Sequence, residues 1–405
     1  MILYLFPKLK RILFLLSLGL FISFSFSFSP FVYSQNDSSE VHVGAERSDL
    51  LLPLIKGKRI AIIGNQTSTV GNGELLPEFL LRQGVNVVKL FSPEHGFRGD
   101  EDAGASVLSS IDKVTGLPIV SLYGNKKKPS SADLHDVDVL LFDLQDVGTR
   151  FYTYISTMHY AMEAAAEHDV PFIVLDRPNP NDFVAGPILE MDCQSFIGMH
   201  PIPLLHGLTV GELALMINGE RWLKVKGGSC NLVVIPIEGW RHGDYYSLPV
   251  PPSPNLRSND AIRLYPSLCL FEATILSVGR GTENPFTMLG YPDKRWGKYS
   301  FKPLSRKGAY NPKHNKKVCY GEDFSAALPQ GGFDLSIFIK YHYLAKSLGY
   351  SLVDRRRTFE LLIGNKKTLL DIEQGKSAAS IEESWRTGLD SYKKLRAKYI
   401  IYEEK

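Results

Sequence analysis

The chain has 405 residues, of which 44% are hydrophobic and 22% are charged. This length is enough for two domains, or for one large domain, with a buried core. The 46 Lys and Arg nearly balance the 43 Asp and Glu. That balance argues against a general nucleic-acid-binding protein, which needs an excess of positive charge. The composition also excludes a disordered chain and a multi-span membrane protein.

The first residues are typical of a secretory signal peptide. Three basic residues precede an apolar run over 12–22, and small residues near Ser34 permit cleavage before Gln35. We therefore expect residues 1–34 to be removed, leaving a periplasmic or extracellular protein without stable membrane insertion. A retained membrane anchor is the alternative. However, the apolar stretch over 12–28 contains a glycine and four serines, and it is short for a span of about 20 residues.

From residue 58 onward, short apolar runs alternate with helical patterns. This alternation predicts βαβ units and a mostly parallel sheet, which is the α/β fold class. Polar, turn-rich segments follow the expected strands, and ligands of open parallel sheets bind outside the carboxyl ends of the strands. We therefore expect a binding site at that edge. The strands are expected at 59–64, 85–91, 118–123, 137–142 and 171–175, and the helices at 75–83 and 154–168.

The second half of the chain is less regular. An amphipathic pattern over 381–399 predicts a last helix that packs as a terminal clamp. Residues 248–254 include four prolines and are expected to form an extended loop. Residues 294–317 include nine Lys or Arg and no acidic residue; they either face an anionic polymer or form a solvated loop. Further helices are expected at 209–218, 334–346 and 355–363, and a strand at 231–236.

The cysteine pattern does not indicate a metal or redox site. No two of the four cysteines have C-x-x-C spacing, which argues against zinc ribbons and thioredoxin-like sites. One or two disulfides are compatible with an oxidising compartment, but a protein of this size does not need them. The preferred interpretation is four free thiols, at Cys193, Cys230, Cys269 and Cys319.

Several standard catalytic motifs are absent from the sequence. There is no phosphate-binding P-loop, no G-x-G-x-x-G, no G-x-S-x-G and no H-E-x-x-H. We therefore expect no cofactor and no metal. Carboxylates remain: Glu94 follows the second expected strand, and Asp143 and Asp146 follow the fourth. A pair of carboxyl groups from neighbouring strand ends is what glycoside hydrolysis requires.

Arginines near these carboxylates have two interpretations. Arg150 either grips a ligand or pairs with Asp146 as a structural residue. Arg280 lies in a glycine-punctuated loop over 279–286, and its guanidinium suits recognition of a carboxylate. The rigid Pro252-Ser253-Pro254-Asn255 segment presents an amide. Only the fold can bring these distant segments together.

Taken together, the motifs resemble the NamZ-type exo-β-N-acetylmuramidases over nearly the whole chain after the signal peptide. Each motif is weak alone, but the combination is long and specific. The motifs are Asn65-Gln66-Thr67, Ser92 to Gly99, Asp143 to Tyr154, Asp176 to Pro180, His206 to Leu213, Pro252 to Asn255, Phe271 to Thr274 with Ser277 to Thr282, and Ile381 to Leu395.

The resemblance implies a Rossmann-like domain joined to a smaller α+β auxiliary domain, with the active site in the cleft between them. We expect the domains to cover 48–215 and 216–405. The implied activity is exo-acting release of N-acetylmuramic acid from the non-reducing ends of peptidoglycan fragments. These fragments are the expected partner, and no nucleic acid is expected. The sequence does not predict the oligomeric state.

The resemblance also suggests roles for individual residues. Glu94 is the candidate general acid, and Asp146 and Tyr152 are the other catalytic candidates. Either Asp146 or the 2-acetamido group of the substrate would stabilise the oxocarbenium-like state. Arg150 or Arg280 would pair with the lactyl carboxylate of muramic acid. The remaining candidates for substrate binding are Asn65, Gln66, His95, Arg98, Gln145, Asn179, Asn255 and Thr282.

Two rival hypotheses use the same residues. A non-catalytic protein that binds cell-wall sugars would share the cleft but need no acid. A metal-dependent hydrolase would use Glu94, His95, Asp143 and Asp146 as ligands, although their spacing does not form a compact ligand set.

Overall fold

A computed structural model of the protein describes residues 40–71, 73–98, 110–326, 328–329 and 332–405. The expected signal peptide and Gly99 lie outside these residues. Within the described part of the chain, no helix is long and apolar enough to cross a membrane. All elements named below belong to one unit of contacting elements, residues 39–405.

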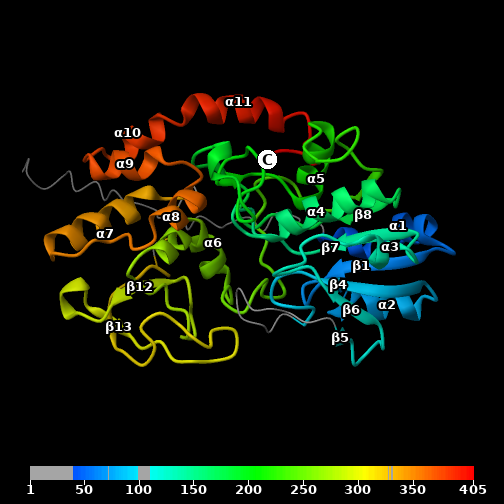
Figure 1. The fold of residues 1–405 in the computed structure, drawn as a ribbon, viewed down its shortest axis with the longest axis horizontal. Coiled ribbons are helices and arrows are strands. Elements are labelled where there is room, and N and C mark those ends of the chain that lie inside the picture. The colour runs from blue at the N-terminus through cyan, green and yellow to red at the C-terminus, as the bar shows by residue number, and fades with distance from the viewer. Residues whose placement is uncertain (1–39, 72, 99–109, 327, 330–331) are drawn as a thin grey trace, which may run out of the picture. The chain divides into compact units, whose positions relative to one another are not determined.

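A seven-stranded sheet is the centre of the first part of the structure, and its strands come from residues 59–235 (Figure 1). Its order is β11-β8-β7-β1-β4-β6-β5, and all neighbours are parallel except β5 and β6. The chain order of the parallel strands reverses between β1 and β7, as in doubly wound nucleotide-binding folds. The strands are β1 (Arg59–Gly64), β4 (Asn86–Ser92), β5 (Ser110–Ile111), β6 (Pro118–Ser121), β7 (Val139–Asp143), β8 (Phe172–Leu175) and β11 (Leu232–Ile235).

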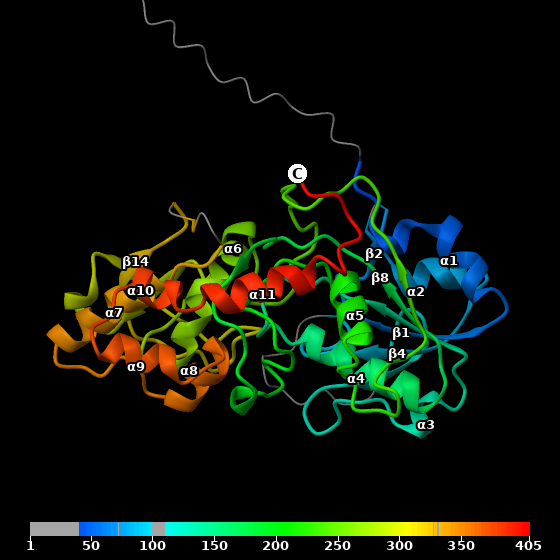
Figure 2. The same cartoon turned by 90° about the horizontal axis from the view of Figure 1, so that it is seen from above.

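Helices cover both faces of this sheet because side chains alternate along the strands. Ala61 and Ile63 of β1 point into the core that includes α4 (Tyr154–Glu167) and α5 (Val210–Gly219). Ile60 and Ile62 point into the core beneath α1 (Ser48–Ile55) and α2 (Leu76–Arg82). Figure 2 shows the two helix pairs on opposite sides of the strands. The predicted α/β class with a Rossmann-like sheet is confirmed.

The second half of the chain combines a small antiparallel sheet with helices. The sheet order is β12-β14-β13, and α6, α7 and α8 share the core that reaches α4 and α5. The bounds are β12 (Met288–Tyr291), β13 (Tyr299–Phe301), β14 (Cys319–Asp323), α6 (Asn259–Leu268), α7 (Leu335–Ser347), α8 (Arg356–Ile363), α9 (Lys367–Glu373), α10 (Ala378–Glu383) and α11 (Arg386–Arg396).

Short elements complete the structure. Two hairpin-like pairs, β2 with β3 and β9 with β10, are antiparallel. The bounds are β2 (Thr69–Val70), β3 (Glu74–Leu75), β9 (Val184–Ala185), β10 (Leu205–His206), α3 (Ser131–Leu134), and the 3-10 helices η1 (Gly44–Glu46), η2 (Met191–Cys193), η3 (Cys269–Ala273) and η4 (Lys294–Trp296).

Most expected elements match the structure, with one correction. The single helix expected over 381–399 is wrong, because α10 ends at Glu383 and α11 begins at Arg386. At the break, both the N–H and the hydroxyl of Ser384 donate to the carbonyl of Ile381, a local bond that competes with a continuous helix. The sequence also gave no prediction of α1, α6 or α9.

The strand expected at 231–236 is β11, and it joins the main sheet beside β8. The Rossmann-like sheet therefore takes in residues beyond 215, while the expected domain boundary at 215/216 itself stays a prediction. In the structure the four cysteines are free, three of them buried and Cys230 partly buried.

Candidate active site

Loops from both halves of the chain meet around one small cavity of about 70 Å³. The loops after β4 and β7 contribute to it. The proline-rich loop, defined as residues 248–255, also contributes, as do α6 and the loop before β12. Five of the predicted site residues are among its lining. The full lining is Glu94, His95, Phe151, Tyr152, Thr153, Tyr154, Ser253, Asn255, Leu256, Tyr265, Arg280 and Phe286.

Glu94 is the one carboxylate in this lining. It follows β4 and is half-buried, and the hydroxyl of Thr153 donates a hydrogen bond of 2.8 Å to its Oε2. The next residue, His95, has a φ of 74°, and Phe286 on the opposite loop has a φ of 63°. Positive φ is costly for residues other than glycine and clusters at functional sites. Two such residues therefore face the same cavity.

Arg280 places a positive charge on the same cavity. Its Nε donates to Glu272 at 3.0 Å, and its guanidinium lies 5.0 Å from the ring centre of Phe286. One quarter of the side chain is exposed, and its terminal nitrogens have no hydrogen-bond partner among the described residues. These two nitrogens form the face of a guanidinium that binds carboxylates in bidentate fashion.

The proline-rich loop is fastened over the cavity by hydrogen bonds to one carbonyl. Tyr152 and Tyr154 each donate to the carbonyl of Pro252 at 2.9 Å. The amide of Gln66 donates to the same carbonyl at 3.2 Å, and Asn65 donates to the hydroxyl of Tyr154 at 2.8 Å. Asn65 and Gln66 thus support the cavity wall from behind.

Asp146 does not line the cavity, although it lies near it. Its side chain is 7% exposed, its Oδ2 accepts from the N–H of Gly148 at 2.7 Å, and its Oδ1 has no partner among the described residues. Burial raises the pKa of Asp146 to about 7, despite the opposing effect of the Gly148 N–H. Nε2 of His206 lies 3.9 Å from Oδ2, but burial lowers the pKa of His206 to about 3, so this neutral ring does not form an ion pair with Asp146.

Arg150 is fully buried and bonded to backbone carbonyls. Its Nη1 donates to Pro187 and Ile202, and its Nη2 donates to Leu362 and Ile363, at 2.8 to 3.2 Å. It neither pairs with Asp146 nor reaches the cavity, so its guanidinium is not available to a substrate carboxylate. Arg150 therefore has a structural role: it connects the 187–202 segment to the end of α8.

Four further predicted residues lie outside the cavity lining. Gln145 donates its amide to the carbonyls of Asp146 and Pro178. Asn179 donates to the carbonyl of Leu208, Arg98 pairs with Asp112, and Thr282 lines a neighbouring hollow. Side-chain amides at strand ends can hold turns as well as bind ligands. Here the amides of Gln145 and Asn179 bond to backbone carbonyls and hold turns.

The metal-ligand arrangement of the rival hydrolase hypothesis is not formed by the described residues. The carboxylate of Asp143 is bound by the guanidinium of Arg177 at 2.6 and 3.0 Å. No group of three His, Cys, Asp or Glu among the residues that the structure describes could hold a metal ion.

Some lining residues were not predicted from the sequence. Thr153 and Tyr154 belong to the long motif after β7, so the motif itself signalled them. Phe286 ends the glycine-punctuated loop that carries Arg280. Tyr265 comes from α6, which was not predicted, and no pattern in the sequence marks it.

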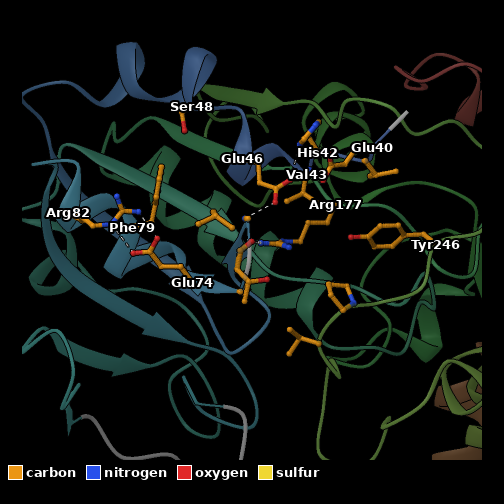
Figure 3. A pocket seen from close by; sticks show the side chains of 17 residues that line it. Glu40, His42, Val43, Glu46, Ser48, Glu74, Phe79, Arg82, Arg177 and Tyr246 are labelled. Carbon is orange, nitrogen blue, oxygen red and sulfur yellow. Dashed lines mark hydrogen bonds and ion pairs between the residues drawn. The ribbon is translucent and has the colours of Figure 1, made fainter. Parts of the chain in front are cut away.

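A larger hollow of about 740 Å³ lies on the other side of the proline-rich loop (Figure 3). Pro249 and Val250 line it, whereas Ser253 and Asn255 of the same loop line the cavity. Arg177 and Tyr246 both line this hollow (Figure 3). None of the predicted site residues lines it, so the smaller cavity is the candidate active site.

Comparison with known proteins decides the family. The model for the N-terminal region of exo-β-N-acetylmuramidase NamZ matches residues 60–260, and the model for its C-terminal region matches residues 263–402. The chain belongs to this family. The peptidoglycan β-N-acetylmuramidase NamZ of Bacillus subtilis strain 168 is 39% identical over 386 residues, which cover 87% of this chain and 90% of that protein.

Solved structures agree with this family membership. A DUF1343 family protein from Bacteroides fragilis is 44% identical, with a TM-score of 0.82 over 91% of this chain and 100% of that chain. A second DUF1343 family protein from the same organism is 30% identical, with a TM-score of 0.77 over 90% of this chain and 99% of that chain. The predicted family, its glycosidase class and the predicted fold class are confirmed.

Proposed function

We propose that the chain releases N-acetylmuramic acid from the non-reducing ends of peptidoglycan fragments, with Glu94 as the general acid. Family membership supports the reaction and the substrate class. The observation that carries the residue assignment is that Glu94 and Arg280, the carboxyl and the guanidinium of the cavity lining, come from opposite halves of the chain and face one cavity. An acid for the glycosidic oxygen and a cation for the lactyl carboxylate are the two groups that this substrate demands.

The size of the cavity supports an exo-acting mode. Ligand pockets usually have volumes of about 300–1,000 Å³, and this cavity has about 70 Å³. A sugar ring is larger than this cavity, so the proposed mode requires the proline-rich loop and the 279–286 loop to move apart. A site that closes around one ring accepts a chain end and not the middle of a strand.

For the second catalytic group we propose the 2-acetamido group of the substrate. Asp146 is the alternative, but its carboxylate is buried outside the cavity lining. The carbonyl oxygen of the acetamido group would attack the anomeric carbon as Glu94 protonates the leaving oxygen, so that the electron pair of the glycosidic bond leaves with that oxygen. Attack with the N–H retained gives an oxazolinium ion. Water then adds to the anomeric carbon and breaks its bond to the acetamido oxygen, while the Glu94 carboxylate takes the proton of the water and becomes the acid again. Tyr152, beneath Pro252, would position the sugar.

The test uses the MurNAc–GlcNAc disaccharide without peptide, in the presence of EDTA, with free N-acetylmuramic acid followed by mass spectrometry. We expect Glu94→Gln to lower kcat by about 10²–10⁴-fold, the usual contribution of a general acid, with little change in KM. Glu190→Gln, which changes an exposed glutamate elsewhere, is the matched control and should retain full activity.

Three outcomes would contradict this proposal. Loss of binding with intact turnover in Glu94→Gln would remove its role as the acid. Binding of the disaccharide without turnover by the wild type would favour the non-catalytic sugar-binding protein. Activity that disappears with EDTA and returns with a divalent cation would favour the metal-dependent hydrolase.

We also propose that the protein acts outside the inner membrane, after cleavage before Gln35. The basic, apolar and small-residue order of residues 1–34 supports this location. Mass spectrometry of the protein from fractionated cells should find a new N-terminus at Gln35 in the envelope or medium. An intact N-terminus in the cytosolic fraction would contradict it.

A further inference from the structure

A second hollow lies beside the candidate active site, on the far side of the 279–286 loop. Its volume is about 420 Å³. Arg280 lines the cavity, and the next two residues, Gly281 and Thr282, line the hollow, so a single backbone segment separates them. The hollow has an apolar floor and a charged rim. Its other lining residues are Glu283, Asn284, Met288, Tyr299, Phe301, Lys302, Leu304, Ser305 and Arg306.

Part of the basic run, defined as residues 294–317, forms one side of this hollow. The N–H of Leu304 donates to the carbonyl of Gly281 at 3.0 Å. On the other side of the cavity mouth, the amide of Asn255 donates to the carbonyl of Gly308 at 2.8 Å. A Cβ on Gly308 would lie 2.3 Å from Cβ of Pro254, so the contact is close. The basic run is thus fastened to both loops that border the candidate active site.

Of the charged residues that line the hollow, Arg306 pairs with Glu283, whereas Lys302 has no ion-pair partner among the described residues. Lys302, Lys316 and Lys317 are exposed, and none of them has an ion-pair partner among the described residues. The N–H of Lys316 donates to the carbonyl of Pro303 at 2.8 Å, so the backbone of Lys316, which does not line the hollow, runs beside the residue that follows Lys302. The basic hollow is defined as the 420 Å³ hollow with its lining residue Lys302 and the neighbouring exposed residues Lys316 and Lys317. These three lysines attract anions to it.

We propose that the basic hollow binds the next carboxylate-bearing sugar of the glycan strand, beyond the bond that is cleaved. This inference rests on the proposed function. In a strand of alternating N-acetylglucosamine and N-acetylmuramic acid, every second sugar carries a lactyl carboxylate. The terminal carboxylate faces Arg280, and the following one reaches the lysines, while Tyr299, which is 37% exposed, offers apolar surface to the sugar rings. Charge complementarity at such a rim raises the rate of productive encounter.

The test compares MurNAc–GlcNAc with the tetrasaccharide MurNAc–GlcNAc–MurNAc–GlcNAc, using the full chain. We measure kcat/KM for each and take their ratio. Lys302→Glu/Lys316→Glu should lower the ratio of tetrasaccharide to disaccharide by about fivefold or more at low salt, and the difference should shrink in about 1 M KCl because salt screens exposed charges. Lys56→Glu/Lys58→Glu changes the same charge on exposed lysines at the start of β1 and should keep the wild-type ratio.

Two further substrates identify the source of the carboxylate. A tetrasaccharide with a neutral amide on its second lactyl group should give the wild type a lower kcat/KM, relative to the disaccharide, than the unmodified tetrasaccharide gives. A tetrasaccharide with a stem peptide on that second lactyl group tests whether the lysines bind a peptide carboxylate instead. If only the peptide-bearing strand responds to the lysine changes, or if the ratio is unchanged in the double variant, the proposal is overturned. If no free N-acetylmuramic acid appears from any substrate, the proposed function has failed. Tetrasaccharide affinities of the wild type and the double variant then decide the inference alone.

Discussion

At the scale of the residue, Arg280 is the side chain on which recognition of muramic acid rests. Arg280 lines the cavity, and Glu272 and Phe286 hold its side chain. Its two terminal nitrogens have no hydrogen-bond partner among the described residues. We expect Arg280→Lys to weaken inhibition by free N-acetylmuramic acid by about tenfold, because an ammonium cannot replace a bidentate guanidinium. Inhibition by N-acetylglucosamine, which lacks the carboxylate, should change little. Inhibition constants of both sugars measure the difference.

Arg98→Lys is the matched control for this prediction. Arg98 belongs to a family motif but pairs with Asp112 outside the cavity lining, so the same chemical change there should not alter the preference for muramic acid. If both variants lose the preference equally, or if Arg280→Lys weakens binding of both sugars alike, Arg280 does not read the carboxylate.

The two arginines in the family motifs show what a sequence can and cannot tell. Arg150 and Arg280 both follow a glycine closely and both suit a carboxylate, and the sequence left them as equal candidates. The structure separates them by burial, since Arg150 is bonded to four carbonyls and Arg280 keeps two nitrogens open. Which carbonyls a chain brings to a guanidinium depends on contacts across about 200 residues of sequence, and no local pattern encodes them.

At the scale of the element, Thr209 connects the start of α5 to the carboxyl end of β8. Its hydroxyl accepts from the N–H of Glu212 and donates to Oδ2 of Asp176 at 2.7 Å. Asp176 is fully buried, so Thr209→Val removes both the helix cap and a donor to a buried carboxylate. We expect a loss of about 2–3 kcal/mol in the free energy of unfolding, measured in urea.

Thr209→Ser is the control for the cap, since it keeps the hydroxyl and removes only a methyl group. It should cost less than about 1.5 kcal/mol. Equal losses in the two variants would show that the methyl packing of Thr209, and not its hydroxyl, stabilises the start of α5.

The elements predicted best are those whose signals are local. Six strands were placed from short apolar runs, and α5 from its threonine cap and closing glycine. The break between α10 and α11 was missed because the apolar face continues across it: Ile381 and Tyr392 are both buried, as one helix would require. The membership of β11 in the main sheet was also not predicted. Strand pairing is a long-range property, and its sequence signal is only the apolar run itself.

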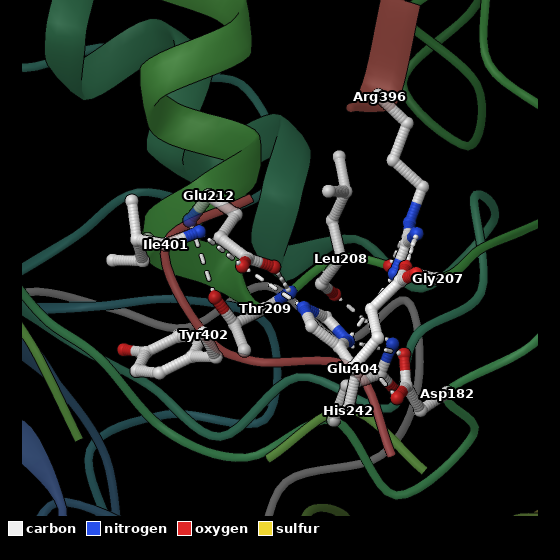
Figure 4. Close-up of polar contacts among 12 residues, drawn as sticks. Asp182, Gly207, Leu208, Thr209, Glu212, His242, Arg396, Ile401, Tyr402 and Glu404 are labelled. Atoms are coloured by element: carbon white, nitrogen blue, oxygen red, sulfur yellow. Dashed lines mark hydrogen bonds and ion pairs between the residues drawn. The ribbon is translucent and has the colours of Figure 1, made fainter. Parts of the chain in front are cut away.

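At the scale of the whole molecule, a buried histidine joins the C-terminal tail to the Rossmann-like sheet (Figure 4). His242 lies 3.0 Å from both carboxylate oxygens of Asp182 and 2.9 Å from Glu212 of α5. The tail returns beside it, where the N–H of Ile401 donates to Glu212 and the N–H of His242 donates to the carbonyl of Glu403. The network thus connects α5 and the chain end with the two loops that contain Asp182 and His242.

The charge state of His242 gives this network a pH dependence. Burial alone would lower the pKa of His242, but its hydrogen bonds to Asp182 and Glu212 outweigh burial and raise the pKa to about 9. The guanidinium of Arg396 lies 3.2 Å from Nδ1 and adds a second positive charge. Because the folded pKa is above the unfolded value of about 6.5, protonation stabilises the fold fully below that value, and the stabilisation is lost as pH rises through 9.

We therefore expect the free energy of unfolding to fall by about 3 kcal/mol between pH 6.5 and 9.5 through this one group. Urea unfolding across this range, in wild type and His242→Gln, measures the contribution as the difference between the two curves. That difference should shrink steadily with rising pH. His168→Gln, at a partly exposed histidine, should give a curve parallel to the wild type. A constant difference between wild type and His242→Gln would mean that His242 stabilises the chain end as a neutral ring, by packing against Trp240 and Tyr402, and not as the cation between two carboxylates.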